Sequence, residues 1–202
     1  MRAILVHGMG RSPLSQLLLA KRLRASGIDV GLFGYSTFVP FNTSLNRLVK
    51  RVAKLGDEPF ILVGYSLGCI LIRAALPRLG SRQPSGCFLL APPNIVPRAA
   101  RFFASNPLYR FYTGDSGQLL LDDAFMAALP VPEGIVRVYA GTAGYRGKWS
   151  PFHEEANDGV LSVSETMLSG ADKPILVPAL HTFIMNSEVV AEDIASAIAA
   201  LR

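Results

Sequence analysis

The chain has little of what disulfide-rich and metal-binding proteins are built from. Its 202 residues include only two cysteines, three histidines and one tryptophan. Cys69 and Cys87 both lie inside apolar runs, so we expect reduced core residues and no disulfide framework. No group of cysteines and histidines has the spacing of metal ligands, so we expect no metal and no organic cofactor.

Long hydrophobic runs are also lacking. The apolar, uncharged stretch from Phe60 to Ile72 is shorter than the roughly 20 residues that span a bilayer. The first ten residues carry one arginine and an apolar run of only four residues before His7, unlike a signal peptide. Since half of all residues are hydrophobic, disorder is excluded. We expect a single cytoplasmic domain over residues 1–202.

Acidic residues are scarce in the first half of the chain. Residues 1–110 hold fifteen Lys and Arg against three Asp and Glu, whereas residues 111–202 hold five against twelve. Part of this excess recurs at helical spacing opposite leucine and valine. This basic face consists of Arg47, Lys50, Arg51 and Lys54. It predicts either a solvated helix surface or a weak contact with an anionic membrane surface or substrate. No nucleic-acid motif accompanies it, so we do not expect a nucleic-acid partner.

What the sequence does contain is a regular alternation of strand-like and helix-like segments. Strand-like runs are residues 3–8, 28–35, 59–65, 86–92, 134–141 and 174–178. Helix-like runs are residues 13–26, 42–56, 67–79, 96–104, 116–129 and 187–201. Because most of these strands are continuously apolar, they are typical of parallel strands covered on both faces. We therefore predict an α/β three-layer sandwich, with a mostly parallel central sheet and helices on both faces. A small cap-like insertion covers about 97–131, and a long loop covers 142–173.

The segment "GYSLG", residues 64–68, lies at the corner between a buried strand and a buried helix. A sharp strand-to-helix turn exposes the central Ser66, and the two glycines remove side chains that would collide. The turn raises the serine hydroxyl above the carboxyl ends of the strands, where open α/β sheets place their sites. Ser66 is therefore the candidate nucleophile, the alternative being a small residue in a tight turn.

A serine nucleophile needs a base and an acid that orients the base. Of the three histidines, His181 follows the last strand and should reach the same sheet edge as Ser66, whereas His153 lies in an acidic loop and is expected at the surface. Asp158 lies in the loop after the fifth strand and is the favoured acid, although Asp-Gly is also a common turn pair. The other acids considered are Asp172, expected at the opposite edge, and Glu154 and Glu155, expected to be solvated.

The segments "VHGMG", "GYSLG", "NDGVLSV" and "LHTFIM", in this order, resemble the α/β-hydrolase superfamily and more narrowly its bacterial lipase- and esterase-like branch. The resemblance implies a triad of Ser66, Asp158 and His181. It also implies that the N–H groups of Met9 and Leu67 form an oxyanion hole. His7 and Gly8 would then support the oxyanion loop.

Two further segments need an interpretation. "GDSG", residues 114–117, resembles a protease nucleophile segment, but here Asp115 is expected to cap a helix that begins near Ser116. The insertion interleaves arginines with aromatic residues. The candidate substrate-pocket residues there are Phe102, Phe103, Tyr109 and Phe111. The alternative is a helix that packs its aromatic side on the sheet.

Together these features predict a serine hydrolase that cleaves small-molecule or lipid carboxylic esters through an acyl-enzyme. An acyltransferase or thioesterase with the same triad is an alternative. A non-catalytic ligand-binding protein on a hydrolase fold is another, since fold alone does not determine function.

Overall fold

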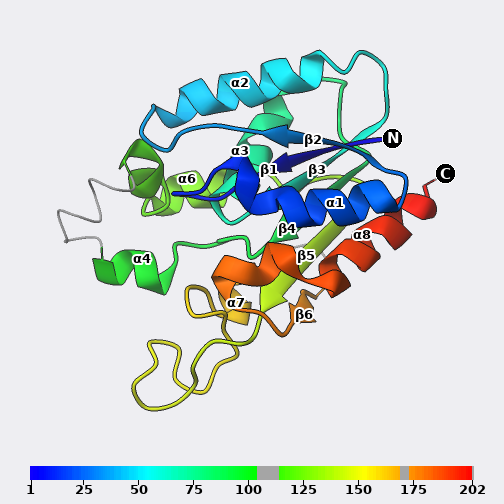
Figure 1. Ribbon diagram of the computed structural model, residues 1–202. Coiled ribbons are helices and arrows are strands. Elements are labelled where there is room, and N and C mark those ends of the chain that lie inside the picture. The colour runs from blue at the N-terminus through cyan, green and yellow to red at the C-terminus, as the bar shows by residue number, and fades with distance from the viewer. Residues whose placement is uncertain (104–113, 169–172, 202) are drawn as a thin grey trace.

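A single parallel sheet organises the chain in the computed structural model, which describes residues 1–103, 114–168 and 173–201. In this part of the chain six strands are joined in the order β2-β1-β3-β4-β5-β6, and every neighbouring pair is parallel (Figure 1). The strands are β1 (Arg2–Val6), β2 (Asp29–Phe33), β3 (Phe60–Tyr65), β4 (Gly86–Leu90), β5 (Ile135–Gly141) and β6 (Ile175–Val177). All six predicted strands are therefore present.

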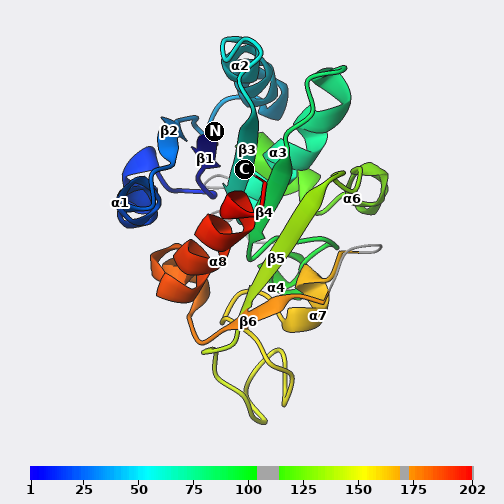
Figure 2. The same cartoon turned by 90° about the vertical axis from the view of Figure 1, so that its right-hand side faces the viewer.

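Helices cover both faces of the sheet, as Figure 2 shows. One face packs against α2 (Phe41–Ala53), α3 (Leu67–Ala75) and α6 (Asp123–Ala128). The other face packs against α1 (Leu17–Ala25) and α8 (Glu188–Ala199). The shorter helices are α4 (Arg98–Phe103), α7 (Val163–Thr166) and the 3₁₀ helices η1 (Pro13–Gln16), η2 (Leu76–Arg78) and η3 (His181–Asn186). The α/β sandwich predicted from the sequence is confirmed.

Strand β3 shows why the strands are apolar throughout. Leu62 packs into the cluster beneath α2 and α3, while Ile61 and Val63 pack into the cluster beneath α1 and α8. All three side chains have no exposed surface. Burying an aliphatic side chain contributes about 1.5–3 kcal/mol, so both faces of the strand stabilise the sandwich. Because β3 is an interior strand, the chain turns from β3 into α3 in the middle of the carboxyl edge of the sheet.

The expectation of one helix over residues 116–129 is wrong. Residues 114–119 are helical, the chain then breaks at 120–122, and α6 follows. Asp115 lies inside the first of these helical stretches and does not cap it. Its carboxylate instead accepts the N–H of Phe41, the first residue of α2, at 2.8 Å. The reason is tertiary: Pro40 precedes α2 and has no side-chain acceptor, so an acceptor 74 residues further along the chain takes that role.

The long loop between β5 and β6 contains a helix that the hydrophobic pattern does not reveal. This helix, α7, begins with a capping box in which Ser162 and Glu165 each bond to the other's backbone N–H. Asp172 lies outside the described residues, so its predicted place at the opposite edge stays a prediction. None of the helices in the described part of the chain has the length and hydropathy that a membrane span requires.

Candidate active site

Ser66 occupies the turn between β3 and α3 in a backbone conformation that is rare for a residue with a side chain. Its φ is 51° and its ψ is −120°. Such a conformation costs on the order of 1–3 kcal/mol and persists only where the surroundings impose it. Here the Ser66 N–H donates to the carbonyl of Leu90 on β4 at 2.9 Å, and the Ser66 carbonyl accepts the N–H of Cys69 at 2.9 Å.

Three glycines make this turn sterically possible. A Cβ on Gly64 would lie 2.9 Å from backbone atoms of Cys69, as predicted from the sequence. A Cβ on Gly68 would overlap the carbonyl oxygens of Val6 and His7, so α3 can approach β1 only without a side chain there. A Cβ on Gly8 would come within 3.1 Å of the Cβ of Ser66. The loop after β1 is thereby held directly against the serine.

His181 is the first residue of η3, which follows β6 after a short loop. Its Nε2 atom lies 3.0 Å from the Oγ of Ser66, although 115 residues separate them in the chain. The backbone N–H of His181 donates to the carbonyl of Asp158 at 2.8 Å. The side chain is only 11% exposed. By contrast, His153 is exposed on the loop, as predicted.

The carboxylate of Asp158 completes the constellation. Its Oδ2 atom lies 2.7 Å from the Nδ1 of His181. Its Oδ1 atom accepts the N–H groups of Val160 at 2.9 Å and Leu161 at 2.7 Å. A Cβ on Gly141, the last residue of β5, would lie 2.6 Å from the Cβ of Asp158, so the loop presses against the end of that strand. Asp158 therefore has both oxygens engaged and a fixed orientation.

His7 is fully buried behind the loop that carries Gly8 and Met9. The N–H of Tyr35 donates to its Nε2 at 3.3 Å, so the proton resides on Nδ1, which donates to the carbonyl of Gly8 at 2.9 Å. Burial lowers the pKa of His7, which keeps the ring neutral, and the ring stacks on Tyr35 with centroids 4.4 Å apart. His7 therefore stabilises the loop through its contacts with Gly8 and Tyr35, and none of these contacts involves Ser66.

Met9 and Leu67, the two residues expected to supply oxyanion donors, flank Ser66. Met9 lines the cavity above the serine. Leu67 is the first residue of α3, and the first N–H groups of a helix have no acceptor within it. Both residues follow strands whose carboxyl ends meet at this edge of the sheet.

A cavity of about 380 Å³ opens above Ser66 and His181. Its described walls are largely apolar and come from the loops after β1, β4 and β5 and from the start of α4. They include Pro93, Pro97, Ala100, Leu120 and Leu161. Of the predicted pocket residues, Tyr109 and Phe111 lie outside the described residues, as do the side chains of Phe102 and Phe103. These residues come from several segments far apart in the chain, so the sequence did not show that they share one cavity. Among the described residues, no group of histidine, cysteine and acidic side chains is placed to hold a metal ion.

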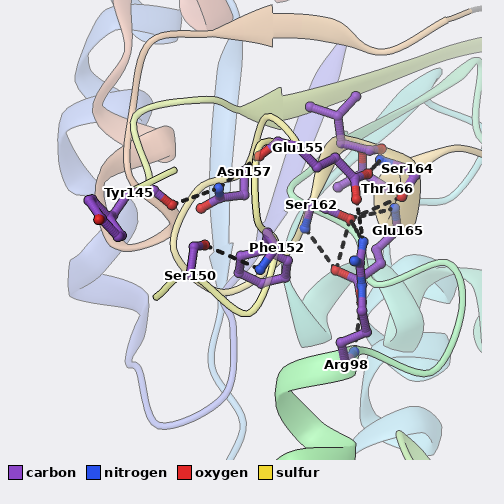
Figure 3. A network of polar contacts seen from close by, with 11 residues as sticks. Arg98, Tyr145, Ser150, Phe152, Glu155, Asn157, Ser162, Ser164, Glu165 and Thr166 are labelled. Carbon is purple, nitrogen blue, oxygen red and sulfur yellow. Dashed lines mark hydrogen bonds and ion pairs between the residues drawn. The ribbon is translucent and has the colours of Figure 1, made fainter. Parts of the chain in front are cut away.

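A partly buried polar network supports the loop that carries Asp158 (Figure 3). Glu165, 1% exposed, accepts the N–H of Arg98 at 2.6 Å through Oε1 and the N–H of Ser162 at 2.8 Å through Oε2. The Arg98 guanidinium donates to Ser162 Oγ at 2.7 Å and to Glu155 at 2.5 Å. Because Arg98 begins α4, this network joins a wall of the cavity to the Asp158 loop.

Glu155 is therefore not the freely solvated carboxylate predicted from its charged neighbours, whereas Glu154 is exposed. Burial alone would raise the pKa of Glu155, but hydrogen bonds from Ser164 and Arg98 outweigh burial and lower it to about 2. The sequence did not single out Glu165, and it placed Arg98 only among the arginines that the insertion interleaves with aromatic residues. The S-x-x-E spacing of Ser162 and Glu165 was the available signal.

The predicted basic face lies on α2 as expected. The residues of that helix toward the sheet, Leu45, Leu48 and Val52, are buried. The four basic residues line a shallow cavity of about 350 Å³ beside β2, which is an edge strand. None of these four residues lines the cavity above Ser66.

The fold and this constellation of side chains define a class of protein. The chain belongs to the alpha/beta hydrolase family, whose family model matches residues 3–199. No curated protein matches it in sequence.

Several solved structures share its fold. A lipase of Bacillus licheniformis, BlEst2, has a TM-score of 0.72 and 15% identity, covering 98% of this chain and 91% of that chain. A pyrethroid hydrolase from Sphingobium faniae has a TM-score of 0.60 and 16% identity, covering 99% of this chain and 96% of that one. The NocB thioesterase domain has a TM-score of 0.55 and 19% identity, covering 98% and 93% respectively. At these identities the likeness establishes the shared fold.

Proposed function

We propose that this hydrolase cleaves carboxylic esters with Ser66 as nucleophile, His181 as general base and Asp158 as the orienting acid. One observation carries the proposal. Two hydrogen bonds in series, here called the relay, join the three side chains. Ser66 Oγ lies 3.0 Å from His181 Nε2, and His181 Nδ1 lies 2.7 Å from Asp158 Oδ2. Ser66 lies at a strained strand-to-helix turn, and both Ser66 and His181 line the apolar cavity. Nucleophilic catalysis requires a base within hydrogen-bond distance of the nucleophile and a third group that orients the base.

The chemistry follows from the atoms in contact. His181 Nε2 takes the proton of Ser66 Oγ as that oxygen attacks the ester carbonyl. The N–H groups of Met9 and Leu67 stabilise the oxyanion of the tetrahedral intermediate. The imidazolium then protonates the departing alcohol and leaves an acyl-Ser66. Water, deprotonated by His181, releases the acid and restores the serine. Throughout, Asp158 keeps the proton on Nδ1 and stabilises the positive charge of His181.

The cavity supports an ester with an apolar part, either a small molecule or a lipid. The solved structures that share this fold include a lipase, a pyrethroid hydrolase and thioesterase domains. The same acyl-enzyme would form from a thioester, or transfer its acyl group to an alcohol. Thioester hydrolysis and acyl transfer are therefore the alternatives. A non-catalytic ligand-binding protein would need the same cavity but no relay.

A fluorophosphonate probe tests the proposal. We expect the probe to modify Ser66 in the intact protein, and Ser66→Ala to abolish both labelling and hydrolysis of acyl esters while melting remains cooperative. The loss in kcat should be on the order of 10⁴- to 10⁶-fold. Ser81→Ala is the matched control, because Ser81 is exposed and lies outside the cavity. Unchanged turnover in Ser66→Ala would end the serine-hydrolase interpretation.

A panel of substrates separates the alternatives once labelling succeeds. Matched oxygen and thiol esters of one acyl chain distinguish an esterase from a thioesterase by their kcat/KM ratio. Adding an alcohol acceptor distinguishes acyl transfer, since the new ester then forms at the expense of the free acid. A protein that is not labelled and hydrolyses no member of the panel is a binding protein.

A further inference from the structure

A second cavity adjoins the one above Ser66. This groove, also about 380 Å³, runs between η1 and the start of α1 on one side and η3 on the other. Its walls include Leu14, Leu17, Leu18 and Phe183, whose side chains are exposed and apolar. Arg11 and Thr182 line both cavities. The two spaces therefore meet beside the candidate nucleophile, and Arg11 lies at their junction.

Within the part of the chain that the structure describes, the side chain of Arg11 has no partner at this junction. Its backbone N–H donates to the carbonyl of Gly8 at 3.3 Å, which places it on the same loop as the oxyanion donor Met9. Among the described residues, no hydrogen bond or ion pair engages the exposed guanidinium. Other arginines in the described chain are engaged, such as Arg73, which bonds to buried carbonyls, and Arg98 in the network around Glu165.

The charge of Arg11 acts within the cavity. Burial raises the pKa of the Tyr65 hydroxyl, and the Arg11 charge opposes that rise, so the two groups interact across the cavity wall. Among the described residues lining the two cavities there is no carboxylate to neutralise Arg11. Asp158 is buried behind His181 and has both oxygens engaged. A cation beside apolar walls therefore remains available to a ligand.

Building on the proposed function, we propose that Arg11 is a specificity-determining residue that binds an anionic group of the ester substrate. The substrate class is an amphiphilic ester that carries a carboxylate or a phosphate, with its apolar parts in the cavity above Ser66 and in the adjoining groove. A guanidinium suits this role because it forms paired, charge-assisted hydrogen bonds with either anion. Because the guanidinium is exposed, salt should weaken this contact.

Two pairs of substrates test the assignment on both sides of the scissile bond. The first pair is the 4-nitrophenyl ester of adipic acid with its far carboxylate free and the same ester with that carboxylate methylated. The second pair is a 1-acylglycerol 3-phosphate and the uncharged 1-acylglycerol with the same chain. The first pair places a carboxylate on the acyl side, and the second places a phosphate on the alcohol side.

We expect the wild-type protein to prefer the charged member of at least one pair in kcat/KM. In Arg11→Gln that preference should fall about 10- to 100-fold, the equivalent of one charged hydrogen-bond contact. The loss should lie mainly in KM and should shrink at high salt, while Arg11→Lys should recover part of it. Lys21→Gln is the matched control, since Lys21 is an exposed cation of α1 that lines neither cavity.

The outcomes separate this assignment from the proposed function. Turnover of the neutral esters with no preference for the charged ones overturns the role of Arg11 alone. A charge preference that survives in Arg11→Gln also overturns it. Absence of turnover for every ester refutes the proposed function, and the assignment falls with it.

Discussion

Replacing Asp158 by asparagine changes one atom at the centre of the relay. In the native loop, Oδ1 accepts the backbone N–H groups of Val160 and Leu161 at 2.9 and 2.7 Å. An asparagine must keep an acceptor at that position, because two N–H donors face it. Its amide nitrogen is therefore forced into the place of Oδ2, which lies 2.7 Å from Nδ1 of His181.

That orientation disables the base. The amide NH₂ donates, so Nδ1 of His181 must accept, and the ring proton moves to Nε2. An Nε2–H facing Ser66 Oγ at 3.0 Å cannot take the serine proton. The neutral amide also offers no charge to stabilise the imidazolium. We expect kcat to fall by roughly 10²- to 10⁴-fold, which corresponds to about 3–5 kcal/mol in the activation barrier.

The assay is steady-state hydrolysis of a chromogenic acyl ester by the wild-type protein, Asp158→Asn and Glu154→Gln. Glu154 is the control because it is exposed on the same loop. Circular dichroism and thermal melting should show the same fold for all three, since asparagine is nearly isosteric with aspartate. Turnover of Asp158→Asn within threefold of wild type would refute the role of this carboxylate and leave Ser66 and His181 to be judged separately.

Three other changes test the network around Glu165, the turn at Ser66 and the basic face of α2. Glu165→Ala leaves the N–H groups of Arg98 and Ser162, partly buried and buried, without their acceptor, so urea unfolding should show a loss of about 2–5 kcal/mol in the free energy of unfolding; a loss below about 0.5 kcal/mol would contradict the network. Gly68→Ala places a Cβ against carbonyl oxygens of β1 and should cost about 1–3 kcal/mol and lower turnover; full stability would show that α3 can move away. Reversing the basic face of α2 to glutamate should weaken binding to anionic vesicles in a salt-dependent way; if the wild type does not bind them at low salt, the face is only solvated.

Local physical chemistry determined much of this protein. A strand that is apolar throughout must be covered on both faces, and a layered α/β structure provides that cover. The strands and their order along the chain were therefore predictable. The glycines around Ser66 were also readable, because a strand that turns sharply into a helix leaves no room for side chains at Gly64 and Gly68. His181 and Asp158 were predicted at the same edge because parallel strands end together, and the structure does bring them together.

Contacts between segments far apart in the chain were decided only by tertiary structure. Asp115 sits in a sequence that suits a helix cap, yet it bonds to Phe41, because packing left that N–H without an acceptor. Glu155 stands in a charged run that suggests solvent, yet Arg98, 57 residues away, holds it. In both cases the partner lies on another element, and no local pattern encodes which polar group will be left unpaired when elements pack. Hydrophobic periodicity specifies which face is buried, and the polar groups then pair with whatever the completed fold places within reach.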